Sequence, residues 1–240
     1  MVHTELNVPG KNHLIESLPE PERTRLMEKC DTLTLAAGSM LFQANRPIEA
    51  AYFPLTGMVS LVGTTEEGHA IEVGTIGNEG IAGGFIALGS DRSASAGMVQ
   101  CSGDFLRIMV EDLRAELGRS RALNEIVQRF AHALTNQISQ SLVCNQTHPI
   151  EERICRWLLM AHDRVGRDEL DLTQEFIAQM LGIRRPTVTV VAGLIQKAGL
   201  IRYSRGRITI LDRQGLQNGA CECYDVVRRE AERLLSGPAV

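Results

Sequence analysis

The segment from 172 to 195, LTQEFIAQMLGIRRPTVTVVAGLI, restricts the fold of this chain more than any other. A short amphipathic stretch from Thr173 to Leu181 ends at Gly182, and a second stretch begins near Arg185. Thr173 is a good N-cap residue, and Gly182 readily takes the left-handed conformation that ends a helix and turns the chain sharply. Two short helices joined in this way predict a helix-turn-helix.

The second of these helices is predicted to have one buried and one exposed face. Its inward stripe consists of Val188, Val191, Ala192 and Ile195. Its exposed start carries Arg184, Arg185, Thr187 and Thr189. An arginine in the first turn of such a helix can hold O6 and N7 of a guanine through two hydrogen bonds in the major groove. We therefore predict that Arg185 reads a base; phosphate contact and simple solvation are the alternatives for both arginines.

A strand-turn-strand pattern follows directly. Two apolar pieces, 200–201 and 208–210, bracket the sequence RYSRGR, whose serine and glycine favour a tight turn. This pattern predicts a basic wing that contacts phosphates, which fixes the position of a protein on DNA without reading sequence. A hairpin with a solvated basic tip is the alternative. The predicted DNA-binding residues are Thr173, Arg184, Arg185, Thr187, Thr189, Arg202, Arg205 and Arg207.

The distribution of charge supports this assignment better than the net charge of −4 does. Residues 1–145 carry 11 Lys and Arg against 17 Asp and Glu, whereas residues 182–213 carry seven basic residues against Asp212 alone. A local basic surface attracts phosphate, while an acidic remainder keeps a protein soluble and discourages indiscriminate binding.

The first part of the chain has the pattern of a sheet protein. Between Leu33 and Ile108, short apolar runs such as 58–62, 71–73 and 105–108 are separated by frequent glycines. Tight turns between many short strands predict an antiparallel β-roll resembling a double-stranded jelly roll.

A long helix is predicted next, over residues 111–146. Its apolar positions recur at steps of three and four, in a stripe made of Leu123, Val127, Phe130, Leu134, Ile138 and Leu142. Because the stripe is narrow and flanked by polar residues, it resembles the seam between two helices, and we predict that it forms a dimer interface. Packing of the helix on its own sheet is the alternative.

His148-Pro149 is expected to end this helix and to act as a hinge, since proline cannot continue the hydrogen-bond pattern. We therefore predict an α+β chain with three parts: a sensor β-roll (1–110), a dimerisation helix (111–146) and a winged helix-turn-helix domain (147–240). Within the last part, a helical stretch from Cys223 to Leu235 is expected to pack on the winged helix.

Composition narrows the class of protein. Apolar residues make up 44% and charged residues 22% of the chain, no apolar run is long enough to span a membrane, and residues 1–11 lack the order of a secretion signal. We expect a cytoplasmic protein with free cysteines. No nucleophile motif, phosphate-binding loop or paired-carboxylate pattern occurs, so no catalytic residue is predicted.

The order of these parts resembles the Crp/Fnr family over residues 15 to 213. The resemblance is strongest at 172–200, where Gly182 and Arg185-x-Thr187-Val188 are similar to the recognition-helix pattern of the family. It implies a bacterial transcription regulator whose roll senses a ligand and whose homodimer reads a two-fold symmetric operator. The implied partners are double-stranded DNA, a second copy of the chain and RNA polymerase. Pro186 replaces the glutamate that well-known members use to contact cytosine, so the operator sequence is not predicted.

The effector pocket implied by the resemblance is a cassette that cradles a cyclic phosphate. Here Gly77, Glu79, Arg92 and Ser93 are similar to it, and Ser139 falls at one of two adenine-contacting positions of the long helix. However, Asn78 separates Gly77 from Glu79, and the number of residues from Glu79 to Arg92 is larger than in cyclic-AMP binders. A cyclic nucleotide is therefore one candidate effector, beside an unknown one.

A metal centre is not predicted. The oxygen-responsive branch of the family uses N-terminal cysteines for an iron–sulfur cluster, and only Cys30 lies there. Cys221-x-Cys223 is too short a motif to assign a metal, although this pair could ligate or oxidise with another cysteine. The histidines lack metal-ligand spacing.

A second function remains open, namely a ligand-binding signalling module whose winged helix contacts protein instead of DNA. Such a wing is expected to carry apolar or mixed residues, whereas this one carries three arginines.

Overall fold

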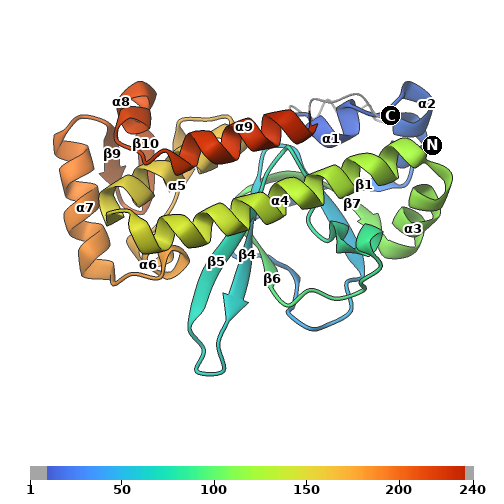
Figure 1. Ribbon diagram of the computed structural model, residues 1–240, viewed down its shortest axis with the longest axis horizontal. Helices are drawn as coiled ribbons and strands as arrows, with labels where there is room; N and C mark the ends of the chain where they lie inside the picture. Colours follow the sequence, from blue (N-terminus) through green and yellow to red (C-terminus); the bar gives the residue numbers. More distant parts are fainter. Residues whose placement is uncertain (1–9, 236–240) are drawn as a thin grey trace.

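The glycine-punctuated strands of the first half pair into two antiparallel sheets in the computed structural model, which describes residues 10–235 (Figure 1). One sheet has the order β1-β7-β3 and the other β2-β6-β4-β5. The strands are β1 (Cys30–Leu35), β2 (Met40–Phe42), β3 (Ala50–Pro54), β4 (Met58–Thr64), β5 (Ala70–Ile76), β6 (Ala96–Cys101) and β7 (Gly103–Met109). The predicted antiparallel β-roll is confirmed.

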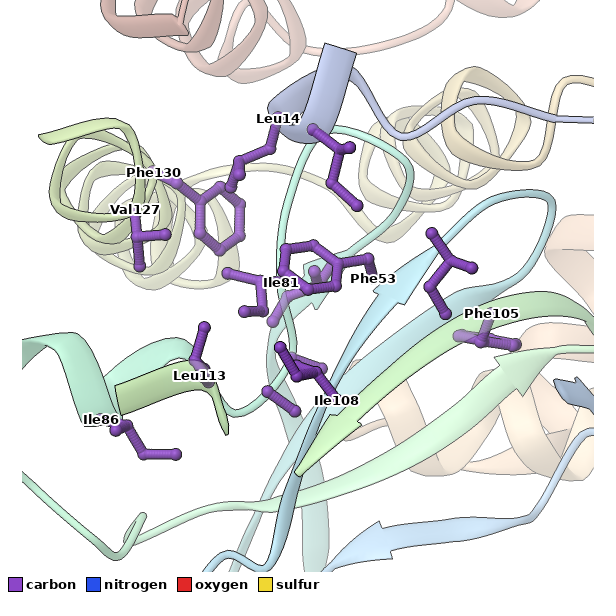
Figure 2. Packing of buried hydrophobic residues seen from close by; sticks show 14 of the residues in the cluster. Leu14, Phe53, Ile81, Ile86, Phe105, Ile108, Leu113, Val127 and Phe130 are labelled. Carbon is purple, nitrogen blue, oxygen red and sulfur yellow. The ribbon is translucent and has the colours of Figure 1, made fainter. Parts of the chain in front are cut away.

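Short helices close the roll, and its core lies between them and the sheets. They are α1 (His13–Glu16), α2 (Glu20–Met27) and the 3-10 helix η1 (Gly84–Leu88). Figure 2 shows Phe53, Ile81 and Ile108 close together in this core, with Val127 and Phe130 of the long helix pointing toward them. The first and last residues of the predicted domains, 1–9 and 236–240, lie outside the described residues.

The predicted helix 111–146 is two helices, α3 (Val110–Arg119) and α4 (Arg121–Thr147). Ser120 separates them because its extended backbone places its side chain to accept a hydrogen bond from Leu123 N, which caps the second helix. The periodic stripe therefore belongs to α4 alone.

Most of that stripe packs inside the chain itself, which corrects the predicted dimer interface. Leu123, Val127, Phe130 and Leu134 are buried in the core of the roll, and Ile138 is packed against it. Gly80 permits this close approach, since a Cβ atom there would lie 2.1 Å from the Phe130 ring. Of the six predicted interface residues only Leu142 is exposed, at 66%. Apolar residues spaced three and four apart can pack against a sheet as well as against a second helix, and here they pack against the roll.

The second half forms the winged helix-turn-helix at one end of the molecule, where α7 and β9 lie in Figure 1. Its elements are α5 (Ile150–Val165), β8 (Glu169–Asp171), α6 (Gln174–Leu181), α7 (Arg185–Lys197), β9 (Ile201–Ser204), β10 (Arg207–Ile210) and α8 (Arg213–Asn218). The predicted helices and wing are confirmed, and β8 adds an unforeseen third strand in the order β8-β10-β9.

The last helix, α9 (Cys223–Leu235), lies along α4 (Figure 1). The predicted helix is present, but its expected packing on the winged helix is wrong, because its neighbours are mainly residues of α4. Among residues 10–235 no helix combines the length and apolar character that a membrane span requires.

Candidate nucleic-acid interface

Two caps set the geometry of the helix-turn-helix. The Thr173 side chain accepts a hydrogen bond from Phe176 N at 3.1 Å, which starts α6. Gly182 ends α6 in the left-handed conformation, at φ 64°. The inner face of α7 then buries the predicted stripe of Val188, Val191, Ala192 and Ile195. Both helices are thus held rigidly, as reading a groove requires.

The opposite face of α7 is exposed and basic at its start. Arg184 and Arg185 are both exposed. Arg185 Nε lies 3.8 Å from Glu175 Oε2, in an ion pair whose side chains are 65% and 74% exposed. A surface pair of this kind contributes about 0 to 1 kcal/mol, so a phosphate or a guanine can displace Glu175. Thr189 donates a hydrogen bond to Gln174 Oε1 at 2.7 Å and fixes α7 against the start of α6.

The three wing arginines differ in their surroundings. Arg205 sits at the exposed turn with φ 50°, followed by Gly206, and Arg202 is exposed on β9. Arg207 instead points across the sheet, where its Nε donates to Asp171 Oδ1 at 2.9 Å. Its position beside β8 leaves Arg205 as the residue at the wing tip.

The wing and the start of α6, which carry several of the predicted residues, lie next to each other. A Cβ atom at Gly206 would lie 3.3 Å from Thr173 Cγ2, so the wing turn lies next to the start of α6. The Tyr203 hydroxyl accepts a hydrogen bond from Gln174 N at 3.0 Å and attaches β9 to the same point. Arg207 is engaged by carboxylates and Thr187 is partly buried, so these two are the least free to contact a ligand.

A partly buried carboxyl group joins the roll to this domain. The Glu72 carboxylate, on β5, accepts hydrogen bonds from Trp157 Nε1 of α5 at 2.8 Å and from Ser60 Oγ at 2.6 Å. Burial raises the pKa of Glu72 from 4.5 to about 7, against the opposing effect of these hydrogen bonds. No sequence motif pointed to this contact, because Trp157 is distant in sequence from the paired strands β4 and β5 that carry Ser60 and Glu72.

Replacing Glu72 with glutamine is expected to remove a pH dependence of stability. The raised pKa means that the Glu72 carboxyl binds its proton more tightly in the folded chain than in the unfolded chain. This difference stabilises the folded chain fully below pH 4.5, and the stabilisation is lost as the pH rises to about 7. The full shift corresponds to about 3 kcal/mol, and because Glu72 keeps some solvent contact we expect E72Q to gain about 1 to 2 kcal/mol above this window. Urea unfolding of both proteins across the window measures the difference. Parallel curves for the two proteins would contradict this interpretation.

The predicted effector residues are dispersed. Glu79 accepts a hydrogen bond from Arg164 Nε of α5 at 2.8 Å, and the Gly77 backbone packs against the same arginine. Arg92 is exposed and lies beside Asp91, while Ser93 is buried and accepts a hydrogen bond from Ser95 N. Ser139 is exposed on α4. The carboxylate of Glu79 thus pairs with Arg164 of α5, while Arg92 pairs with Asp91.

A cavity of about 350 Å³ lies next to Glu79, between the roll, α4, α5 and α9. Its wall combines charged groups, among them Asp163, Arg164 and Arg228, with apolar groups such as Ile126 and Met160. Sequence reasoning missed it because its residues come from separate segments spread between His13 and Leu235. Of the predicted effector residues, the wall contains Glu79 only.

Comparison with known proteins matches both halves of the chain. The model of the cyclic nucleotide-binding domain matches residues 32–119, and that of the Crp-like helix-turn-helix domain matches residues 152–218. The transcriptional regulator SdrP of Thermus thermophilus is 25% identical over 198 residues, which cover 78% of this chain and 93% of SdrP. The match to the Crp-like helix-turn-helix domain ends at residue 218, before α9 begins.

Solved structures of similar fold cover most of this chain. A protein described as a transcriptional regulator of the Crp/Fnr family, from Eubacterium rectale, has a TM-score of 0.65 at 19% identity and covers 87% of this chain and 98% of its own. FixK2 from Bradyrhizobium japonicum has a TM-score of 0.67 at 14% identity, covering 80% and 98% respectively. At these identities the likeness shows the fold alone.

Proposed function

Because the chain belongs to the Crp/Fnr family of transcription regulators and has its helix-turn-helix domain, we propose that it binds a two-fold symmetric DNA operator as a homodimer, with α7 in the major groove and the wing on phosphates. The family is one of regulators and not of enzymes. Arg185 is the proposed base-reading residue, and Arg184, Arg202 and Arg205 are the proposed phosphate contacts.

The observation that carries this proposal is a set of exposed arginines in the helix-turn-helix and the wing that no carboxylate of the described chain opposes. Among the described residues, no ion pair involves Arg184, Arg202 or Arg205, although most other arginines of the chain lie beside a carboxylate. A positive charge that the fold leaves exposed and unpaired is available to phosphate. The alternative function, a wing that contacts protein, is less consistent with this surface.

A dimer is supported by the face of α4 that the roll and α9 leave uncovered. Leu142 and Val143 are exposed at 66% and 50%, near the end of α4 that leads to the DNA-binding domain. In the proposed dimer, two copies of α7 about 34 Å apart would meet successive major grooves, one turn of DNA apart. Thr135 and Ser139 lie on exposed positions further along the same helix.

Selection of bound fragments from randomised duplex DNA by the full chain tests this proposal. We expect an enriched sequence with two-fold symmetry, and binding that weakens steeply as salt is raised because phosphate contacts release counterions. Enrichment of an asymmetric site would contradict the dimer. No enrichment, together with capture of a protein by the wing, would favour the alternative function.

The effector and the regulatory output are further parts of the proposal. Since the Glu79 carboxylate already accepts a hydrogen bond from Arg164, we favour an effector other than a cyclic nucleotide. Repeating the DNA selection in the presence of cyclic AMP and of cyclic GMP tests this preference. RNA polymerase is the proposed protein partner of the bound dimer.

A further inference from the structure

Four metal-ligating side chains from two distant segments meet at the junction of the domains. Cys144 lies in the last turn of α4, and His148 directly follows that helix. Cys221 lies between α8 and α9, and Cys223 is the first residue of α9. The packing of α9 along α4 brings the two pairs together, and the four ligating atoms all lie within 4.8 Å of one another.

The separations between these atoms suit a single metal ion. Cys144 Sγ lies 3.5 Å from Cys221 Sγ, and Cys223 Sγ lies 3.6 Å from His148 Nδ1. Tetrahedral Zn²⁺, with bonds of about 2.3 Å to sulfur and about 2.0 Å to nitrogen, places its ligands about 3.5 to 3.8 Å apart. An iron–sulfur cluster has several iron atoms between its cysteines and needs a wider cage.

The surroundings of the four side chains are those of a closed site. Cys144 and Cys223 are completely buried, Cys221 is 5% exposed and the His148 side chain is 16% exposed. His148 Nε2 lies 3.2 Å from the Glu222 carboxylate, which orients the ring, while Nδ1 lies 3.2 Å from Thr147 Oγ1 and 3.6 Å from Cys223 Sγ. A carboxylate behind a histidine ligand is a common support in zinc sites. Gln140 Nε2 donates a hydrogen bond to Cys223 Sγ at 3.0 Å.

Positive charge is also present where such a site needs it. Three thiolates around Zn²⁺ leave one net negative charge, and burying it requires a nearby cation. Arg153 and Arg156 of α5 are both close enough to act electrostatically on Cys144. In the described part of the chain, the buried Nε of each lacks a hydrogen-bond partner.

We propose that Cys144, His148, Cys221 and Cys223 bind one Zn²⁺ ion in a structural site that fastens α9 to the end of α4. Binding converts three thiols to thiolates and releases their protons to solvent. The ion has no open position for a substrate, since all four ligands come from the protein. The site joins the helix proposed for dimerisation to the start of the DNA-binding domain, and it holds even if the chain binds no operator.

The test measures metal content and ligand geometry on the full chain. Protein purified in reducing buffer containing zinc is expected to hold one zinc per chain by elemental analysis. After removal of zinc, Co²⁺ is expected to give the intense visible bands of tetrahedral thiolate coordination. The variants C144S, C221S and C223S should fall to near zero zinc at equal zinc supply. The C155S variant is the matched control, because Cys155 is buried on α5 near Gly219 but outside the group.

Some outcomes would overturn the proposal. Wild-type protein that holds no zinc and gives no tetrahedral Co²⁺ bands would do so, and this measurement does not depend on how any variant folds. Equal zinc loss from C155S and C221S would do so as well. An iron–sulfur absorption spectrum, or a Cys144–Cys221 disulfide in place of bound zinc, would replace the single-ion site.

Discussion

Replacement of Arg185 with alanine is expected to weaken operator binding by about 1 to 3 kcal/mol, which is about 5- to 150-fold in affinity. The guanidinium sits in the first turn of α7 and is exposed, and within residues 10–235 its partner is Glu175 in a surface ion pair, so little else in the protein changes when it is removed. Competition between operator and random duplex DNA at fixed salt measures the effect. The preference for one base pair in each half-site should relax.

Arg205 provides the control for this prediction. It lies at the wing tip, where phosphate contact is expected, so R205A should weaken binding to operator and random DNA alike and reduce the salt dependence by about one unit of slope. If R185A lowers both affinities equally, Arg185 contacts phosphate and the assignment of base reading is wrong.

Replacement of Trp157 with alanine is expected to cost about 3 to 5 kcal/mol of unfolding free energy. The indole is 4% exposed in the core cluster that α5 shares with β4 and β6, and its Nε1 donates to Glu72. Truncation leaves a cavity and removes a hydrogen bond from a partly buried carboxylate, and both effects act in the same direction. Denaturant unfolding, followed by circular dichroism, measures the loss.

The W157F variant separates the two contributions. Phenylalanine keeps most of the ring volume but cannot donate to Glu72, so its loss should be about 1 to 2 kcal/mol and should grow as pH rises and Glu72 ionises. In the background of E72Q the pH dependence should vanish. A loss below about 1 kcal/mol for W157A would show that the interface between α5 and the roll contributes little to stability.

Much of the fold follows from local patterns. The helix-turn-helix is encoded by residues close in sequence, since Thr173 caps α6 and Gly182 ends it, and the strands of the roll alternate with glycine turns. Such signals need no knowledge of the rest of the chain. For the same reason Arg184, Arg185 and Arg205 were correctly expected to be exposed.

Features that depend on distant segments were not predictable in this way. The stripe of α4 has the same spacing whether it meets a second helix or a sheet, so Phe130 was misassigned to a dimer interface. Glu72 and Trp157 have no neighbouring motif, and α9 could not be placed without knowing where α4 runs. Cys144 and His148 stand four residues apart, but only the fold brings Cys221 to them.

The return of α9 along α4 limits how the DNA-binding domain can swing. The chain enters that domain through His148 and Pro149, and leaves it through residues 219–222 to lie again on the helix from which it came. A body attached at one point swivels in every direction, whereas a body attached at two points rotates only about the line that joins them. The two attachments here are adjacent, and the packing of α5 on β4 and of α6 on β5 is a further contact that must open before the domain can rotate about them. Sliding of the domain along α4 would in addition require α9 to detach from that helix.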